Sequence, residues 1–557
     1  MKNLVQKIMM GAFLLVGTTA CVNDLNVTPI DPSTNQTVDQ DALFNKCYAT
    51  FALTGQTGAD GNGDVDGIDE GVSSFYRMLF ELNEFPADGG WWNWHADAGV
   101  NQIYNLTWNS SNSLVAGLYY RFYFDITLCN HYLELFAKNS DDKTQKQVAE
   151  VRWIRALNYY YLLDMFQNVP FAETVTTEKP KQIARKDLYA WLENELLELE
   201  NELPATKVNT YRVDRNAATF VLMRMYLNAE VYTGTPQWNK AAEYAAKIMK
   251  SEYALASNYA QLFMGDNQKN ANNTEVLLWI YQGVETESWG GSRFLVSGTR
   301  DAGNNPFGSD DSWSCWRSTP TLIEAWFDKA EALNILSTAK AAGYKWADET
   351  VIPKLAGDDR ALLCQSCNNK YNFDADTAKY NFDADTATFT ADLATLYNLY
   401  DQKKIGDNGS TFGNGWTICK WTGVYSDGTQ YGSDSKFPDT NIPFLRSSEA
   451  YLTYAEAVYH GGAAVNGTAE SAIQALRDRA HCTGTFTLDE ESLLKEWQRE
   501  FYSEGRRRTD LVRFGKFTSG DYTWEGKYAG VDDRYNVYPL PNADVVANSN
   551  LKQYLGY

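Results

Sequence analysis

Histidine, cysteine and recognisable catalytic motifs are scarce in this chain. Only 4 His and 8 Cys occur among 557 residues. The histidines are not spaced as zinc ligands relative to one another or to the cysteines. The sequence contains no GxxxxGK(S/T) phosphate loop, no HExxH, no GxSxG elbow and no dinucleotide-binding fingerprint. These absences favour a binding protein over the enzyme classes that carry such motifs.

Basic residues and long apolar runs are also in short supply. The chain has 49 Lys and Arg against 71 Asp and Glu, which gives a net charge of −22 and a pI near 4.7. Such a chain repels a phosphate backbone, so the composition argues against nucleic acid as a partner. After the N-terminus, no stretch reaches the roughly 18 uninterrupted apolar residues of a membrane-spanning helix.

The cysteine pattern does not build a disulfide framework. Setting Cys21 aside leaves an odd number of cysteines spread over a long chain. Cys364 and Cys367 form a lone CxxC without the second pair that a zinc site requires. The sequence therefore predicts a local disulfide or two free thiols at this position rather than a metal site.

The first residues have the order of an export signal. Lys2 and Lys7 precede a short apolar segment at residues 8–16, and small residues then lead to Cys21. This pattern predicts a lipoprotein signal peptide at residues 1–20, with Cys21 as the lipid-anchored first residue of the mature protein. Residues 21–45 continue as an extended arm. The alternative is an ordinary signal peptide that is cut nearby.

Aromatic residues, in contrast, are abundant, at 14% of the chain with 17 Trp and 35 Tyr. Three indoles fall close together in residues 89–94, behind two glycines. On a strand or a helix they would point in several directions, so we expect a loop or short turn that presents at least one of them. Flat indole faces suit the C–H faces of sugar rings. The alternative is a tryptophan-rich plug between helices.

Segments with helical periodicity lie on both sides of a region that has few periodic runs. Apolar residues recur at helical spacing in residues 145–166 and 186–203, and a capping box at residues 487–490 predicts the start of another helix. Two helix pairs with small residues at their contact faces, 216–232 with 238–250 and 449–460 with 469–480, are typical of tetratricopeptide-type repeats. We therefore expect a mostly α-helical protein. Its scaffold would span about 115–255 and 440–515, within one domain at 46–557.

The segments outside this scaffold are predicted to carry binding. Residues 58–110 and 265–440 are rich in Gly, Asn, Asp and aromatics and have few periodic runs. An acidic glycine-rich stretch at 58–71 begins like an EF-hand loop, but Ser73 stands at the twelfth position in place of glutamate, so a solvated loop is favoured. Two nearly identical octapeptides at 371–378 and 380–387 are interpreted as a local duplication without chemistry.

Several stretches together carry a family resemblance: residues 21–25, 29–32, 149–156, 444–452, 500–514 and 538–541. The most specific is EFYSEGRRRTDLVRF at 500–514 in a chain with an N-terminal lipobox. They resemble the SusD/RagB family, the surface glycan-binding lipoproteins of Bacteroidota. The resemblance covers nearly the whole chain.

The resemblance implies a fold, a ligand and a location. Tetratricopeptide-like helix pairs would form a right-handed superhelical scaffold with a loop-rich ligand-binding face. That face would bind starch or malto-oligosaccharides without catalysis. The protein would be lipid-anchored in the outer membrane, face outward, and dock on a TonB-dependent, SusC-like transporter.

The resemblance also implies individual site residues. An arc of aromatics falls on Trp94, Trp289 and Trp313, with Trp92 beside it. Arg77 matches an arginine that contacts sugar hydroxyls. Asp97 stands where the family has asparagine, so this side chain has lost two donors while it still accepts hydrogen bonds.

A metal site follows only from the same resemblance. A structural calcium is implied near Asp266 and Asp439, although Asn441 occupies a place where an acid is expected. No other cofactor is implied.

Three alternatives to the starch binder remain open at this point. The first is a family member that binds another polysaccharide. The second is a secreted glycoside hydrolase, because such an enzyme needs only two carboxylates and the chain has 71 acidic residues. The third is a helical-repeat adaptor that binds only protein and buries its aromatic residues.

Overall fold

The structure is a computed structural model. It describes residues 38–55, 63–270, 274–300, 307–342, 351–364, 372–374, 379–381, 416–524 and 526–557. The chain divides into two compact units, 1–45 and 46–557. The predicted signal peptide, the lipid-anchor residue Cys21 and Cys367 lie outside the described residues, as do most of the duplicated octapeptides.

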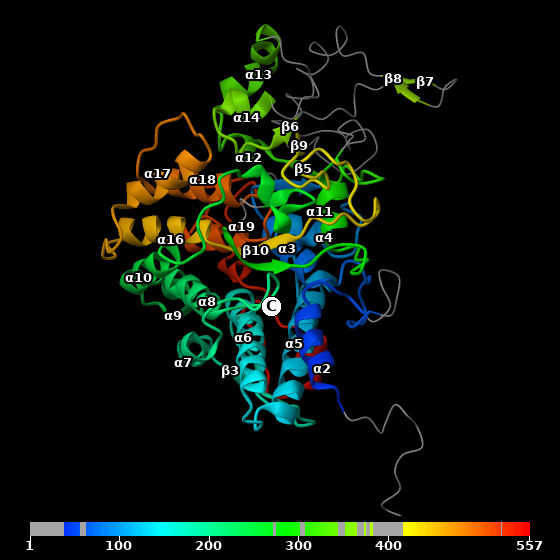
Figure 1. Ribbon diagram of the computed structural model, residues 1–557, viewed down its shortest axis with the longest axis vertical. Helices are drawn as coiled ribbons and strands as arrows, with labels where there is room; N and C mark the ends of the chain where they lie inside the picture. Colours follow the sequence, from blue (N-terminus) through cyan, green and yellow to red (C-terminus); the bar gives the residue numbers. More distant parts are fainter. Residues whose placement is uncertain are drawn as a thin grey trace, which may run out of the picture. The chain divides into compact units, whose positions relative to one another are not determined.

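The first half of the scaffold is a series of helices that pack on one another in chain order (Figure 1). The series consists of α5 (Ser113–Phe136), α6 (Asp142–Met165), α7 (Arg185–Glu202), α8 (Arg215–Leu227) and α10 (Trp238–Met249). The expectation of a mostly helical fold is confirmed.

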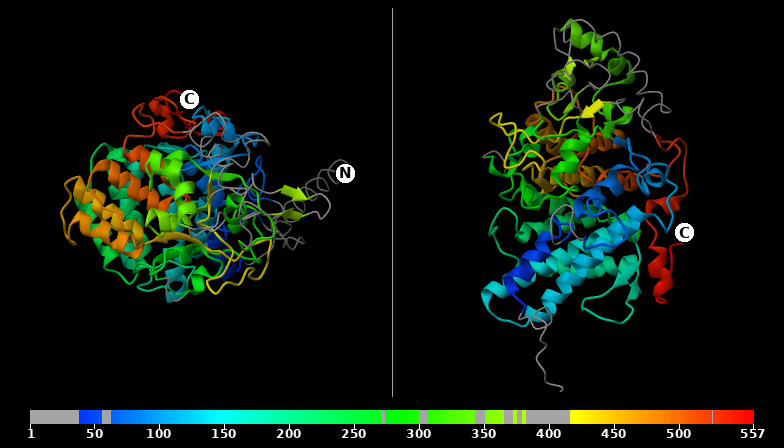
Figure 2. Two further views of the ribbon diagram at one scale, coloured as in Figure 1. Left: turned by 90° about the horizontal axis from the view of Figure 1, so that it is seen from above. Right: turned by 90° about the vertical axis from the view of Figure 1, so that its right-hand side faces the viewer.

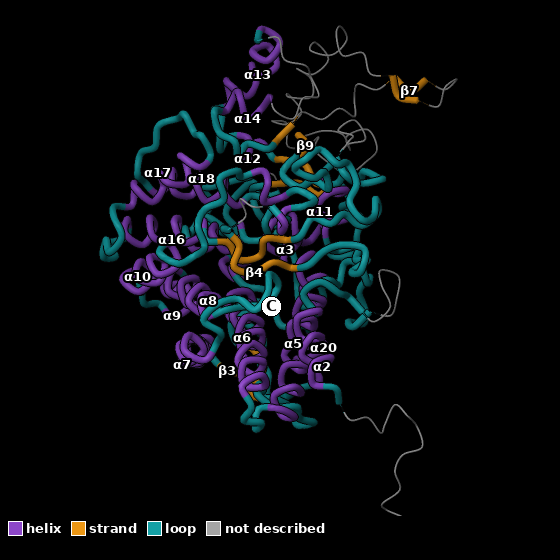
Figure 3. Tube along the Cα trace, viewed as in Figure 1, coloured by secondary structure: helices purple, strands orange, loops and turns teal. Residues whose placement is uncertain are grey.

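The second half of the scaffold continues the same array. It consists of α16 (Ser448–Tyr459), α17 (Ala469–Arg479), α18 (Glu490–Phe501) and α19 (Arg507–Arg513). α16 packs on both α10 and α17, so helices far apart in sequence lie side by side (Figures 2 and 3). Ala241 and Ala245 on α10 and Ala450 and Ala457 on α16 are fully buried, as the small-residue pattern predicts.

Two predicted helix boundaries are wrong. The helix expected over 216–232 is divided at Asn228, whose side chain donates to the Arg224 carbonyl, and α9 (Ala229–Thr233) follows. α18 is capped by Asp489 instead of by Thr487, because the Asp489 carboxylate accepts a hydrogen bond from the backbone N–H of Ser492 at 2.8 Å.

Two antiparallel sheets assemble the loop-rich region. One has the order β1 (Gly90–Trp92), β5 (Trp316–Ser318), β9 (Trp416–Ile418) and β6 (Leu363–Cys364). In the other, β4 (Val276–Ile280) pairs with β10 (Ile442–Arg446). These pairings bring the early tryptophan segment next to residues more than two hundred positions later, because Trp92 lies opposite Trp316.

The remaining elements are short. The other helices are α2 (Gln40–Ala49), α3 (Phe75–Glu84), α4 (Val100–Tyr104), α11 (Ser292–Thr299), α12 (Pro320–Ile323), α13 (Lys329–Ala341), α14 (Val351–Ala356) and α20 (Asn542–Ala547). Single 3-10 turns lie at Ala260–Phe263, Asn267–Lys269 and Asp533–Asn536. The other strand pairs are β2 (Val169–Phe171) with β3 (Lys181–Ile183), and β7 (Asn372–Asp374) with β8 (Lys379–Asn381). None of the helices in the described ranges combines the length and apolar character needed to cross a bilayer.

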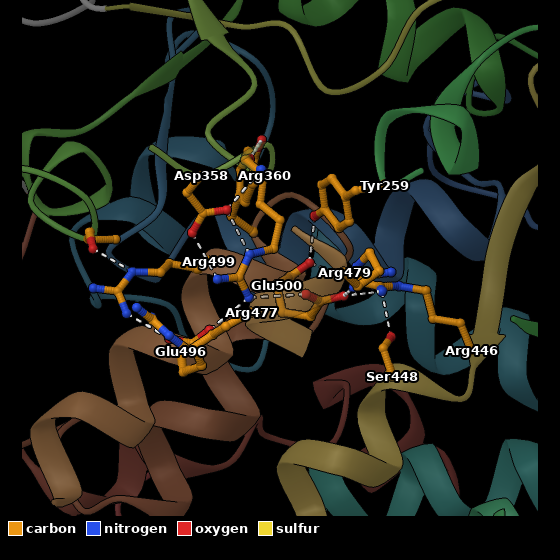
Figure 4. Close-up of polar contacts among 12 residues, drawn as sticks. Tyr259, Asp358, Arg360, Arg446, Ser448, Arg477, Arg479, Glu496, Arg499 and Glu500 are labelled. Carbon is orange, nitrogen blue, oxygen red and sulfur yellow. Dashed lines mark hydrogen bonds and ion pairs between the residues drawn. The ribbon is translucent and has the colours of Figure 1, made fainter. Parts of the chain in front are cut away.

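A buried network of charges ties the loop-rich region to α18 (Figure 4). We call it the ionic junction; it comprises Glu275, Asp358, Arg360, Arg446, Arg479, Glu496 and Glu500. Glu500 accepts from Arg446 Nη1 at 2.6 Å and pairs with Arg479, and Arg360 reaches it at 3.2 Å. Burial alone would raise the pKa of Glu500, but Arg479, Arg446 and Arg360 hold it well below its ordinary value.

The arginine run of the family signature positions the first aromatic segment. Arg507 donates to both oxygens of Asp88, at 2.7 and 2.9 Å, just before β1. Arg506 pairs with Glu449 at 2.8 Å and with Asp510 at 3.0 Å. The run stands at the start of α19, and its third member, Arg508, donates to the Asn536 carbonyl.

Candidate functional site

The candidate site is an open cleft of about 810 Å³ that several separate parts of the chain surround. Its lining comes from residues 67–72, α3, the segment from Trp94 into α4, the start of α5, and the segments before α11 and before β5. We call it the aromatic cleft. Its lining residues are Gly67, Ile68, Asp69, Val72, Arg77, Glu81, Trp94, Asp97, Ala98, Val100, Ser113, Leu114, Trp289 and Trp313.

Three indoles that are distant in sequence form a continuous surface in this cleft. Trp94 and Trp313 have ring centroids 6.0 Å apart with planes at 31°, and Trp313 and Trp289 lie 6.5 Å apart at 40°. Trp94 is 38% exposed, and the other two are partly exposed. Because each ring is tilted relative to the next, their faces do not share one plane.

Trp92 does not join this surface. Its side chain is fully buried, and it contacts Trp94 edge-to-face at 5.5 Å. The predicted loop is a strand at this point: β1 pairs with β5, which turns Trp91 and Trp92 inward and leaves only Trp94, beyond the strand end, exposed. The prediction that Trp92 contacts glycan therefore has no geometric support.

The glycines near the indoles serve close packing rather than exposure. A Cβ on Gly90 would overlap the Trp316 ring, so β1 and β5 can approach only with glycine there. A side chain on Gly71 would collide with Trp289, and one on Gly290 would collide with Ser74. These contacts hold Trp289 against residues 71–74 at the start of α3.

Arg77 is held so that part of its guanidinium remains available. Ser74 caps α3, and Arg77 follows in the first turn. Its Nε donates to Glu81 Oε1 at 2.8 Å, and its Cζ atom lies 4.7 Å from the Phe294 ring centroid. Within the described residues, Glu81 is its only polar partner, so both Nη groups can donate to a ligand in the cleft.

Three carboxylates share this single cation. Asp69, Glu81 and Asp97 all line the cleft with Arg77. Burial raises the pKa of Glu81 in spite of Arg77, and Asp97 and Asp69 raise it further. Partial burial also raises the pKa of Asp97, although Trp92 Nε1 donates to its Oδ2 at 3.5 Å. The cleft therefore holds more acceptors than its own donors satisfy.

The residues predicted for calcium are engaged with protein donors. Asp266 accepts from the backbone N–H of Ser426 at 2.9 Å and from its hydroxyl at 2.5 Å. Asp439 accepts from the Tyr425 hydroxyl at 2.6 Å. Asn441 accepts from the backbone N–H of Gln282, a structural role. This donor-rich setting does not fit a calcium ion, and no group of three or more His, Cys, Asp or Glu among the described residues is arranged for a metal.

Two further expectations concern the acidic stretch and the thiols. Asp64 of the EF-hand-like stretch pairs with Arg121 at 3.3 Å and Lys46 at 3.5 Å, while the following residues form a wall of the cleft. Five described cysteines form no disulfide: Cys47, Cys129, Cys315, Cys419 and Cys482. Cys367 of the CxxC pair lies outside the described residues, so the expected disulfide or pair of free thiols stays a prediction.

Sequence reasoning missed Asp69 and Glu81 as cleft residues. Glu81 stands four positions after Arg77, a spacing that places two side chains on one helix face, so the pair was visible in the sequence. No comparable signal marked Asp69, because its position depends on how residues 63–72 fold over α5. Gly117 on α5 permits that approach, since a side chain there would strike Ile68 and Met78.

Known proteins resemble this chain over nearly its whole length. A family model described as the SusD family matches residues 297–557. The chain is 38% identical to the starch-binding protein SusD of Bacteroides thetaiotaomicron, over 98% of this chain and 97% of that protein. A SusD-like protein P2 of Formosa agariphila is 22% identical over 43% of this chain and 49% of its own length.

Solved structures share the fold at lower identity. A SusD-like carbohydrate-binding protein of Bacteroides fragilis aligns with a TM-score of 0.66 and 19% identity, covering 94% of this chain and 99% of that one. Surface glycan-binding protein A of Bacteroides thetaiotaomicron, in complex with laminarihexaose, aligns with a TM-score of 0.63 and 16% identity, covering 92% and 98%. The chain belongs to the SusD family, whose members bind glycans without catalysis.

Proposed function

We propose that this protein binds starch or malto-oligosaccharides in the aromatic cleft and does not cleave them. The observation that carries the proposal is the convergence of Trp94, Trp289 and Trp313 into one partly exposed surface beside Arg77. The curated relative that aligns over nearly the full length is named for starch binding.

The shape of the indole surface favours a coiled glucan. Successive ring planes tilt by 31° and 40°, so the three indole faces from Trp94 to Trp289 do not form one flat platform. An α-1,4-glucan coils, and its inner and outer faces follow a curve. A flat β-glucan would contact a planar row of rings more fully. The laminarihexaose-bound neighbour is only 16% identical, so it bears on the fold and not on the linkage bound here.

Polar groups in the cleft match the hydroxyl pairs of a glucose unit. The two Nη groups of Arg77 can donate to neighbouring hydroxyl oxygens, while Asp97 and Asp69 accept from hydroxyl protons. Each indole contact and each hydrogen bond replaces contacts with water and contributes little on its own. We expect an affinity on the order of micromolar to millimolar for a short oligosaccharide.

The proposal includes a place in the cell. The lipobox at Cys21 supports a lipid anchor in the outer membrane, with the binding unit facing outward. Glycan that is held there would pass to a TonB-dependent, SusC-like transporter. Cys21→Ser is expected to move the protein from the membrane fraction to the soluble fraction and to end incorporation of labelled palmitate. Retention of Cys21→Ser in washed membranes would contradict the anchor.

Titration calorimetry with maltoheptaose tests the ligand assignment. Trp313 is the middle ring, so Trp313→Ala separates Trp94 from Trp289 and is expected to lower affinity at least about tenfold. Because the ring is partly exposed, the melting temperature should change little. Trp238→Ala is the matched control, since Trp238 stacks on His460 at the N-terminal end of α10, outside the cleft.

A ligand panel completes the test. Amylose, pullulan, dextran, inulin and xylan are compared under the same conditions, and new reducing ends are assayed in parallel. Preference for a glycan other than an α-glucan would reassign the ligand within the family. Unchanged maltoheptaose binding by both Trp313→Ala and Trp94→Ala would show that the aromatic cleft is not the binding site.

A further inference from the structure

Behind the indole surface, one buried arginine joins three segments. Arg293 lies in the first turn of α11 and is 4% exposed. Its Nη1 donates to Ser309 Oγ at 2.7 Å and to the Lys436 carbonyl at 3.0 Å, and it also pairs with Asp310. A single side chain therefore connects α11 with the segment before Trp313 and with the segment before β10.

The same guanidinium contacts two of the three indoles. Its Cζ atom lies 5.9 Å from the Trp289 ring centroid and 5.6 Å from that of Trp313, distances at which a cation is attracted to an aromatic face. The two rings themselves are 6.5 Å apart. Arg293 thus lies against both rings and is absent from the cleft lining.

Arg293 reaches Trp289 by a second route. Lys436 Nζ lies 4.5 Å from the Trp289 ring centroid, and Phe437 packs on the same indole at 5.4 Å. Both residues belong to the segment whose backbone Arg293 holds through the Lys436 carbonyl. Removing the guanidinium would take away its direct contact with Trp289 and its hydrogen bond to the segment that packs on that ring, while the contacts with residues 71–74 remain.

We propose that Arg293 is a positioning residue that sets the tilt between Trp289 and Trp313 and thereby the selectivity of the cleft for curved over extended glucans. The inference rests on the proposed function. Indoles on loops can adopt several rotamers, and ordering them on binding costs free energy. With Arg293 in place, the tilt between the Trp289 and Trp313 rings is already set before the ligand binds.

The experiment compares Arg293→Met and Arg293→Lys with the wild type on maltoheptaose and cellohexaose by titration calorimetry. Methionine keeps the length and removes the cation and its donors. We expect Arg293→Met to lose about tenfold affinity for maltoheptaose and less than about twofold for cellohexaose, and Arg293→Lys to recover part of the loss. Near-UV circular dichroism of the unliganded proteins should show a changed tryptophan signal for Arg293→Met only.

Controls separate positioning from stability. Arg300, at the other end of α11, is also buried and donates to the carbonyls of Cys419 and Trp421, so Arg300→Met reports loss of a buried arginine away from the indoles. If Arg293→Met does not fold, Asp310→Asn, which removes an exposed partner of Arg293, is expected to give about a two- to threefold loss on maltoheptaose alone.

Each outcome decides the inference. Equal losses on both glucans, or an unchanged tryptophan signal with unchanged affinity, would overturn the role of Arg293. If the wild type itself fails to bind maltoheptaose, the proposed function fails. The dichroism of Arg293→Met against Arg300→Met then still shows whether Arg293 sets the ring geometry.

Discussion

At the ionic junction, buried carboxylates and guanidiniums neutralise one another, whereas in the aromatic cleft three carboxylates share one arginine. Glu500 and Glu496 both have pKa values held below the ordinary value, because arginines outweigh the effect of burial. Glu81 and Asp97 have pKa values raised above it, because burial outweighs Arg77. The direction of the pKa shift thus differs between these carboxylates of the junction and of the cleft, because the arginines outnumber the acids only around the former.

The two regions also differ in what a bound molecule could gain. At the junction, the guanidinium of Arg446 is shared among Glu275, Glu500 and Glu504. In the cleft, the Nη groups of Arg77 have no polar partner among the described residues, and Glu81 Oε2 is buried without one. The cleft thus offers guanidinium donors and carboxylate acceptors that a polar ligand could satisfy.

The largest expected effect comes from breaking the junction. Glu500→Gln leaves Arg446 and Arg479 buried with less negative charge and should lower the free energy of unfolding by about 3–5 kcal/mol, measured by denaturant titration. Glycan affinity per folded molecule should stay unchanged. Glu198→Gln, at an exposed ion pair with Arg152, is the control and should change stability by less than about 0.5 kcal/mol. A loss for Glu500→Gln no larger than that of the control would refute the structural role of the network.

Removing the Arg77 cation from the cleft should mainly lower glycan affinity, whereas Glu500→Gln should mainly lower stability. Arg77→Met takes away the free Nη donors, so affinity for maltoheptaose should fall at least about tenfold. The loss of stability should become smaller as pH falls, because the raised pKa of Glu81 favours its protonated form once the cation is gone. Arg152→Met, which breaks an ion pair on α6, is the control for binding. Wild-type affinity in Arg77→Met would show that the guanidinium does not meet the sugar.

Glu84 is a buried carboxylate that belongs neither to the ionic junction nor to the cleft lining, so the pH dependence of its contribution to stability extends the comparison. It is fully buried at the end of α3 and accepts from the backbone N–H groups of Gly505 and Arg506. Burial raises its pKa from 4.5 to about 7. Between pH 4.5 and about 7, Glu84 is protonated in the folded state and ionised in the unfolded state. The stability that this protonation contributes is therefore fully present below about pH 4.5 and is lost as pH rises through 7.

Glu84→Gln isolates that contribution. The stability difference between wild type and Glu84→Gln should shift by about 1–3 kcal/mol in favour of the variant between pH 5 and pH 8, measured by denaturant titration at each pH. The lowered pKa of Glu500 makes the protein more stable as pH rises. Because wild type and Glu84→Gln share this pH dependence, it cancels in the stability difference between them. A difference that is constant with pH would contradict the raised pKa.

The smallest expected effect is at Asp97. Asp97→Asn restores two donors and should raise maltoheptaose affinity about two- to fivefold. Because the pKa of Asp97 is raised, the wild type should bind more tightly as pH falls through it, when the protonated carboxyl can donate. The affinity of Asp97→Asn should depend less on pH. Calorimetry across pH checks both points, and weaker binding by Asp97→Asn would mean that the carboxylate serves only as an acceptor.

The helices could be predicted from apolar periodicity, because a helix buries a face that the sequence displays locally. The scaffold helix α6 began and ended close to the expected positions. The sheet that carries Trp92 could not be predicted in this way. Its partner strand lies at Trp316–Ser318, and nothing within residues 89–94 announces that pairing. The segment was therefore predicted as a loop, and the buried position of Trp92 was missed.

The site was predicted unevenly for the same reason. Trp94, Trp289 and Trp313 came from the family resemblance, and the structure brings them together. Arg293 was missed because its partners Ser309 and Lys436 stand 16 and 143 positions away. Side chains that act through long-range contacts leave no periodic signal, whereas ligand-facing indoles are conspicuous by residue type.

The most direct test of the central claim is the crystal structure of this protein with maltoheptaose. We expect a curved oligosaccharide whose sugar rings lie on Trp94, Trp313 and Trp289 in turn, with neighbouring hydroxyls on the Nη groups of Arg77. Sugar bound elsewhere on the protein, with the cleft filled only by solvent at saturating ligand, would contradict it.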